Sequence, residues 1–114
     1  NNQEKMDQVS LIDRFYIEEF AYFLEQMSAA KDIDGHSLPH NSMIVWGSGL
    51  SDGNQHSHKD LPIILAGHAG GKFQTGRHFD VGAKPLNNLF VRMLEEVGLP
   101  KAQFGDSTGS ENRV

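Results

Sequence analysis

The chain has 114 residues, with 10 Lys and Arg against 15 Asp and Glu, and a formal net charge of −5. This length suits one domain, and the acidic balance argues against a general nucleic-acid surface. Seven Phe, two Tyr and one Trp, with 22% charged residues, argue against a disordered chain. No stretch approaches the ~18 apolar residues of a membrane span. With no cysteine, disulfides and thiolate metal ligands are excluded.

Residues 3–30 are predicted to form one long amphipathic helix. Its apolar residues recur every three or four positions and therefore share one face. An isolated helix of this length is marginal in water, so the face needs a partner surface. We interpret its aromatic residues as core packing, with a cofactor-binding face as the alternative. The stripe consists of Met6, Val9, Ile12, Tyr16, Phe20, Phe23 and Met27.

Two short apolar runs within residues 42–67 are predicted to be buried strands. The first covers residues 43–46 and the second residues 61–66, and each is closed by glycine. Pro62 cannot donate a ladder hydrogen bond, so it should stand at a strand entrance or on an edge. The connecting loop of residues 48–60 suits either an antiparallel pair or a crossover of minimal length.

A second helix is predicted over residues 85–98, with Pro85 at its first position and Gly98 as its cap. The polar tail, residues 105–114, is expected to be flexible. The element order is thus helix, strand, strand, helix, an α/β arrangement. Because two strands alone make a weak sheet, residues 1–114 are either a single domain that associates or the C-terminal fragment of a larger one. The uncovered apolar face predicts a homo-oligomer or docking onto the missing N-terminal part.

The loop between the strands carries the residues best suited to a metal ion. Residues two apart in an extended segment point the same way, so His56 and His58 could face one cation. Asp52 or Asp60 could add a carboxylate, giving a ligand set suited to zinc or manganese. The alternative is a solvated polar loop without a ligand.

Arg77 and His78 form a second candidate site, for an anion. Arginine donates bidentately to phosphate or sulfate, and a hydrogen bond to a loop carbonyl is the simpler alternative. His36, His40 and His68 are interpreted as surface or capping residues.

Several sequence blocks also resemble a known family in the same order: NSMIVWGSGLSDGNQHSHKDLPIILAG, TGRHF, PLNNLFVRMLEEVGLP and FGDSTG. Together they resemble the C-terminal region of a family of uncharacterised exported bacterial proteins named for an HXXSHH motif. The resemblance covers essentially the whole chain, and the naming motif would lie just before Asn1. It implies export to the periplasm or cell envelope, although no secretion signal lies within these residues.

That family is distantly similar to the alkaline phosphatase and sulfatase superfamily, whose α/β fold uses bound metal on phosphate or sulfate esters. The resemblance implies that this chain is a C-terminal fragment of such a fold, with His58 or His56 as a metal ligand. The superfamily's Asp-His-Gly turn is replaced here by Gly47-Ser48-Gly49-Leu50, so other histidines would have to substitute. It therefore implies a metal-dependent hydrolase that is inactive as this piece. The alternative function is a non-catalytic scaffold that oligomerises.

Overall fold

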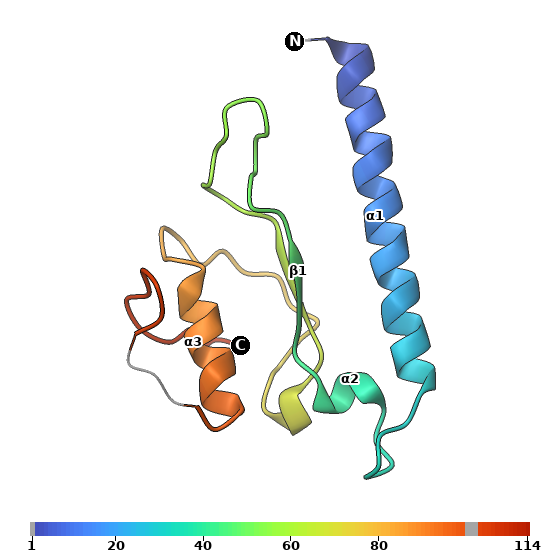
Figure 1. Cartoon of the computed structure of the whole chain (residues 1–114), viewed down its shortest axis with the longest axis vertical. Helices are drawn as coiled ribbons and strands as arrows, with labels where there is room; N and C mark the ends of the chain where they lie inside the picture. The colour runs from blue at the N-terminus through green and yellow to red at the C-terminus, as the bar shows by residue number, and fades with distance from the viewer. Residues whose placement is uncertain (1, 100–102) are drawn as a thin grey trace. The chain divides into compact units, whose positions relative to one another are not determined.

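The computed structural model describes residues 2–99 and 103–114, which form helices and one small antiparallel sheet, an α/β arrangement in the broad sense (Figure 1). None of the helices in these residues is long and apolar enough to cross a bilayer. In chain order the elements are α1 (Gln3–Ala29), α2 (Leu38–Asn41), β1 (Ile44–Gly47), β2 (Ile63–Ala66), the 3-10 turn η1 (Ala69–Gly71) and α3 (Asn87–Glu96).

The chain divides into two compact units, Asn1–Pro39 and His40–Val114. The first unit contains α1 and the turn that follows it. The second contains the sheet, η1, α3 and the C-terminal segment.

Helix α1 begins at a side-chain cap and ends with its last turn closed. The Oδ1 atom of Asn2 accepts a hydrogen bond from the backbone N–H of Lys5 at 3.3 Å, which satisfies one of the unpaired donors of the first turn. At the other end, the N–H of Ala30 donates to the carbonyl of Met27. The predicted helix extended one residue further, to residue 30.

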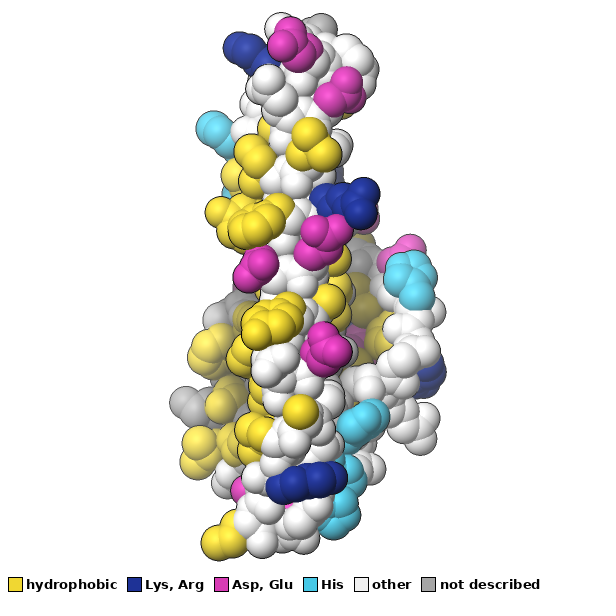
Figure 2. All heavy atoms as spheres, turned by 90° about the vertical axis from the view of Figure 1, so that its right-hand side faces the viewer, with side chains coloured by type: hydrophobic (Ala, Val, Ile, Leu, Met, Phe, Trp, Pro, Cys, Tyr) yellow, Lys and Arg dark blue, Asp and Glu magenta, His cyan; other side chains and the backbone are white. Residues whose placement is uncertain are grey.

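No residue of α1 is buried. Hydrophobic side chains lie exposed along the helix, between charged ones (Figure 2). Of the aromatic residues that we interpreted as core packing, Tyr16 and Phe23 are 57% and 47% exposed, whereas Phe20 is half-buried. The first unit by itself therefore does not supply the partner surface that the sequence of α1 demands.

The segment after α1 was predicted as turn, and most of it is. An isolated bridge pairs Lys31 with Ser37, and Gly35 has a φ of 86°. The short helix α2 then leads into the second unit and was not predicted, because Pro39 and the neighbouring turn residues hide a single helical turn.

The two strands pair antiparallel, which settles the direction that the sequence left open. The register runs from Ile44 opposite Ala66 to Gly47 opposite Ile63. Pro62 stands just before β2, where its missing N–H breaks no ladder bond. Both strands are four residues long and lie one or two positions later than the predicted starts.

Helix α3 carries most of the small core. Leu89 and Val91 are buried on it, and Phe73, from the glycine-rich segment after the sheet, is also buried. The regular helix is shorter than the predicted 85–98, because its first turn is a 3-10 type turn in which Asn88 donates to the Pro85 carbonyl. Gly98 has a φ of 76°, as expected of a left-handed helix cap.

The C-terminal segment differs most from expectation. We expected residues 105–114 to be a flexible tail, but the structure packs them against α3. The N–H of Glu111 donates to the backbone carbonyl of Asn88 at 3.0 Å, and Glu111 is only 4% exposed. Polar partners on α3, rather than apolar contacts, hold this segment, which explains why its polar composition was misleading.

Candidate functional site

The loop between β1 and β2 continues the hairpin beyond the sheet (Figure 1). Its tip is closed by a bridge between Asp52 and Ser57, with the Ser57 N–H donating to the Asp52 carbonyl at 3.0 Å. The Asp52 Oδ1 atom accepts hydrogen bonds from the N–H groups of Asn54 (2.9 Å) and Gln55 (3.0 Å). Asp52 therefore shapes the turn with one carboxylate oxygen and keeps the other for a further partner.

His58, one of the predicted metal ligands, is held in a defined orientation. Its Nδ1 atom lies 2.7 Å from the carbonyl oxygen of Gly49. A carbonyl can only accept, so Nδ1 donates its proton to it, which leaves Nε2 as the ring nitrogen available to a metal ion. The side chain is exposed. Metal-binding histidines are commonly oriented by such a hydrogen bond from the other ring nitrogen to a backbone carbonyl.

The remaining predicted ligands do not gather around His58. His56 is exposed and has a φ of 52°, and Asp60 has a φ of 53°, a conformation uncommon outside glycine. Across residues 2–99 and 103–114, no three His, Asp or Glu side chains are close enough to share a metal ion. The loop thus offers one oriented imidazole, and the metal assignment stays a prediction.

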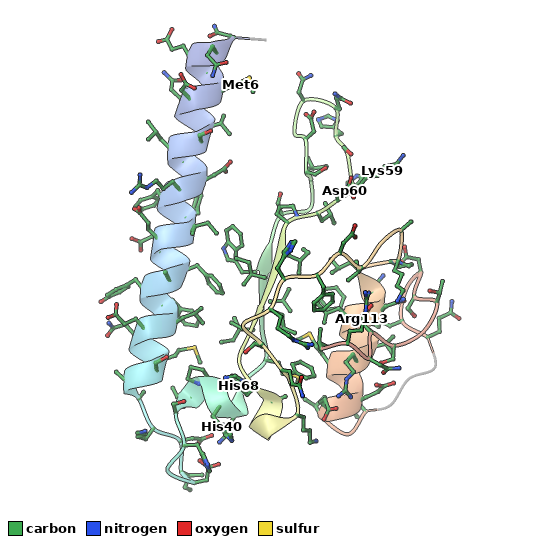
Figure 3. All side chains as sticks on the ribbon, turned by 180° about the vertical axis from the view of Figure 1, so that it is seen from behind. Met6, His40, Lys59, Asp60, His68 and Arg113 are labelled. Carbon is green, nitrogen blue, oxygen red and sulfur yellow. The ribbon has the colours of Figure 1, made fainter. Side chains whose placement is uncertain are left out.

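A histidine pair that the sequence did not suggest lies at the other end of the sheet. The rings of His40, from α2, and His68, after β2, have centroids 6.3 Å apart (Figure 3). The Nδ1 atom of His68 lies 3.3 Å from the carbonyl oxygen of Phe73. We had interpreted both histidines separately as surface or capping residues, and nothing in the sequence pattern indicates that the antiparallel pairing brings them together.

Arg77 and His78, the predicted anion-binding pair, line a hollow of about 450 Å³ in the second unit. We call it the basic hollow. Three cationic side chains and a histidine contribute to it, from the segment after η1 and from the C-terminal segment. Its lining residues are Lys72, Gln74, Arg77, His78, Phe79, Asn112, Arg113 and Val114.

Arg77 is fixed by backbone carbonyls. Its Nε donates to the Gln74 carbonyl at 3.0 Å and its Nη2 donates to the Arg113 carbonyl. Its guanidinium carbon lies 5.7 Å from the centre of the Phe79 ring, within cation–π range. Among the described residues no carboxylate forms an ion pair with it. Arg77 therefore makes the hydrogen bond to a loop carbonyl that was the simpler alternative. Its positive charge has no carboxylate counter-ion among the described residues.

Arg113 completes the hollow, and the sequence analysis missed it because the tail was expected to be flexible. Its guanidinium donates to both oxygens of Glu111, at 2.7 and 2.9 Å, and to the Asp80 carbonyl at 3.1 Å. It also lies 5.0 Å from the centre of the Phe79 ring. The hydrogen bonds from Arg113 lower the pKa of Glu111 to about 2, although burial acts in the opposite direction.

Lys72, at the edge of the basic hollow, is paired with a carboxylate on α3. Its Nζ lies 2.8 Å from Glu96, which also accepts from Arg92. The hydrogen bond from Lys72 lowers the pKa of Glu96. Lys72 and Arg92 share this carboxylate, and with Glu95 beside Arg92 the two cations are balanced by two carboxylates. Arg92 also lies 3.8 Å from Glu95.

No protein-family model, no curated protein and no solved structure matches the chain. Functional assignment therefore rests on the chain's own chemistry. Three features carry it: the exposed apolar helix α1, the oriented imidazole of His58 and the basic hollow.

Proposed function

We propose that this chain is a non-catalytic association segment, which forms a homo-oligomer by packing α1 against α1 of a second copy. The observation that supports the proposal is that a helix of 27 residues buries none of its side chains. Exposed apolar surface of this extent is typical of interaction sites. Packing also supplies the stability that an isolated helix lacks in water.

The spacing of the apolar residues of α1 favours another helix as the partner. Met6, Val9, Tyr16, Phe20, Phe23 and Met27 occupy six of the seven successive a and d positions of a heptad pattern that runs from Met6 to Met27, and Asp13 occupies the seventh. A repeat of 3.5 residues keeps one seam facing a partner helix. Within this seam Met6, Val9, Tyr16 and Phe23 are 47–57% exposed.

Apolar residues on the other side of α1 favour an assembly larger than a simple helix pair. At 100° per residue, Leu11, Phe15 and Tyr22 lie away from the seam, and they are 56–67% exposed. A helix with apolar residues on more than one side is typical of a buried position. We therefore expect copies to pack on both sides of α1.

The molar mass in solution tests this proposal. By light scattering at micromolar concentration, the chain should have at least twice the mass of the monomer of 12.7 kDa. Phe23→Glu should lower the mass, because it places a charge in the seam. Ala21→Glu adds the same charge outside the seam and should leave the mass unchanged. A monomeric chain, or equal effects of the two variants, would contradict the proposal.

A second candidate function is metal-dependent hydrolysis of phosphate or sulfate esters by an exported, alkaline-phosphatase-like protein of which this chain is a C-terminal part. Support comes from the sequence resemblance and from His58, whose Nε2 lone pair is free while Nδ1 donates to Gly49. His56 and the free oxygen of Asp52 would be further ligands. A bound zinc or manganese ion would polarise the ester oxygen, and residues beyond this chain would supply the nucleophile.

Titration with zinc or manganese tests the second candidate separately. The imidazole NMR signals of His58 should shift first, and His58→Ala should abolish the strongest binding. His36→Ala removes an imidazole from the other unit and serves as the control. Binding that is absent, or that survives His58→Ala, would discard the ligand assignment.

A further inference from the structure

We propose that α1 packs against α1 of a second copy in the antiparallel direction, around a twofold axis that passes between Asp13 and Tyr16. In this arrangement each Asp13 lies opposite Tyr16 of the second copy, and its carboxylate accepts a hydrogen bond from the Tyr16 hydroxyl. The direction and the central contact rest on the association proposed above, and they go beyond it because association alone is compatible with either direction.

The first support is the uneven distribution of aromatic side chains along the seam, the row of a and d positions defined above. The seam begins at Met6, near the N-terminal end of α1 (Figure 3). Its first three residues have no aromatic ring, and its next three are all aromatic. The bulky side chains therefore lie together in one half of the row. In chain order the seam consists of Met6, Val9, Asp13, Tyr16, Phe20, Phe23 and Met27.

An antiparallel pair places each of these aromatic residues opposite a smaller one. Reversing one helix about the point midway between Asp13 and Tyr16 brings every a position opposite a d position. Layers of one large and one small side chain have similar widths, so the two helices can keep a constant spacing along the seam. At each end a methionine thioether meets an aromatic ring, which is a favourable contact. The layers are Met6 with Phe23, Val9 with Phe20, and Asp13 with Tyr16.

A parallel pair would instead place identical residues opposite each other. Three successive layers would each hold two aromatic rings, whereas the layer at Val9 would hold two small side chains. The layer at Asp13 would bring two carboxylates together within the seam. Like charges repel, and packing removes part of the water that screens them. Side-chain size and charge therefore both disfavour the parallel direction.

The second support is the chemistry of the two central residues. Asp13 is exposed and Tyr16 is 57% exposed. Among the described residues, neither the Asp13 carboxylate nor the Tyr16 hydroxyl has a hydrogen-bond partner. A carboxylate only accepts and a phenol O–H donates, so the two groups are complementary. Because a twofold interface is self-complementary, the same hydrogen bond forms twice.

Distances between spin labels distinguish the two directions. The chain has no cysteine, so Gln3→Cys and Gln26→Cys each give a single labelling position that flanks the seam. In an antiparallel pair, the Gln3 positions of the two copies should lie about 35 Å apart along the helix axis, at a rise of about 1.5 Å per residue. Mixing copies labelled at Gln3 with copies labelled at Gln26 should add a short distance between the two kinds of label.

Tyr16→Phe tests the central contact, because it removes the hydroxyl and keeps the ring in the seam. It should raise the dissociation constant about tenfold in sedimentation equilibrium, as expected for the loss of hydrogen bonds to a charged group. Tyr22→Phe is the matched control. It removes a hydroxyl from a residue that lies outside the seam and is 59% exposed, and it should leave the dissociation constant unchanged.

The molar mass separates failure of the direction from failure of the association. An associated chain in which the Gln3 labels lie side by side would overturn the antiparallel direction and leave the association standing. Equal effects of Tyr16→Phe and Tyr22→Phe in an associated chain would overturn the central contact and with it this proposal. A monomeric chain would overturn both the proposal and the association on which it rests.

Discussion

Asn88 and Thr108 form a reciprocal pair that joins α3 to the C-terminal segment. The backbone N–H of Thr108 donates to the Asn88 Oδ1 at 2.8 Å, and the Asn88 Nδ2 donates to the Thr108 Oγ1 at 3.2 Å. Asn88 is only 5% exposed. Its backbone carbonyl also accepts from Glu111, so a single residue of α3 holds three groups of the segment that forms one wall of the basic hollow.

Asn88→Ala should release the C-terminal segment. It removes both side-chain hydrogen bonds to Thr108 at a position that is only 5% exposed, which should lower the free energy of unfolding by about 2 kcal/mol. Urea denaturation and faster amide exchange at Thr108 and Glu111 would record the change. Asn87→Ala is the matched control, because the Asn87 hydrogen bond to Asp106 is exposed. Equal losses of unfolding free energy in the two variants would show that the Asn88–Thr108 hydrogen bonds stabilise the fold no more than the exposed bond of Asn87 does.

Acid should destabilise the second unit through Glu111. The hydrogen bonds from Arg113 lower the pKa of this carboxyl from its ordinary value of 4.5 to about 2. The folded-state pKa is the lower one, so this contribution is complete above about pH 4.5 and is lost as the pH falls toward 2. The loss should be at most about 3 kcal/mol.

Urea denaturation between about pH 6 and about pH 3 measures this effect. Glu111→Gln removes the titrating group, so it should be less stable at neutral pH and show a flatter pH profile. Profiles of equal slope in the two proteins would show that Glu111 is not responsible.

Gly47→Ala should strain the hairpin. A Cβ atom at Gly47 would lie 2.6 Å from the carbonyl oxygen of Pro62 and 2.6 Å from the Cδ1 of Ile63. Because the Pro62 carbonyl belongs to the backbone, it cannot turn aside, and we expect a loss of about 2 kcal/mol in unfolding free energy. Gly49→Ala, where a Cβ would meet nothing within 4 Å, should have little effect on the same thermal unfolding measurement.

Phe73→Ala should remove the largest apolar side chain from the core of the second unit. Phe73 is 2% exposed, with the Arg92 guanidinium 5.5 Å from its ring centre. Truncation should cost about 3 kcal/mol. Phe104 is 44% exposed and contacts Phe90 edge-on, so Phe104→Ala should cost clearly less. A larger loss for Phe104→Ala would mean that the core lies elsewhere.

The local elements were largely accessible from sequence. The stripe from Met6 to Met27 repeats with helical period, and the apolar runs beside Gly47 and Gly67 are short and closed by glycine. Such signals act between residues a few positions apart, so no knowledge of distant contacts is needed. Arg77 and His78 were predicted from the sequence as an anion-binding pair because arginine donates bidentately to phosphate or sulfate, and the structure places both at the basic hollow.

The sequence by itself determined where α1, β1, β2 and α3 form, because hydrophobic period and glycine or proline boundaries are local properties. Only the tertiary structure decided that the strands run antiparallel, that His40 meets His68 and that Arg113 joins Arg77 at Phe79. These relationships depend on which distant backbone groups satisfy one another's hydrogen bonds. Asn88 holds the polar C-terminal segment through such hydrogen bonds, and amino-acid composition alone does not indicate them.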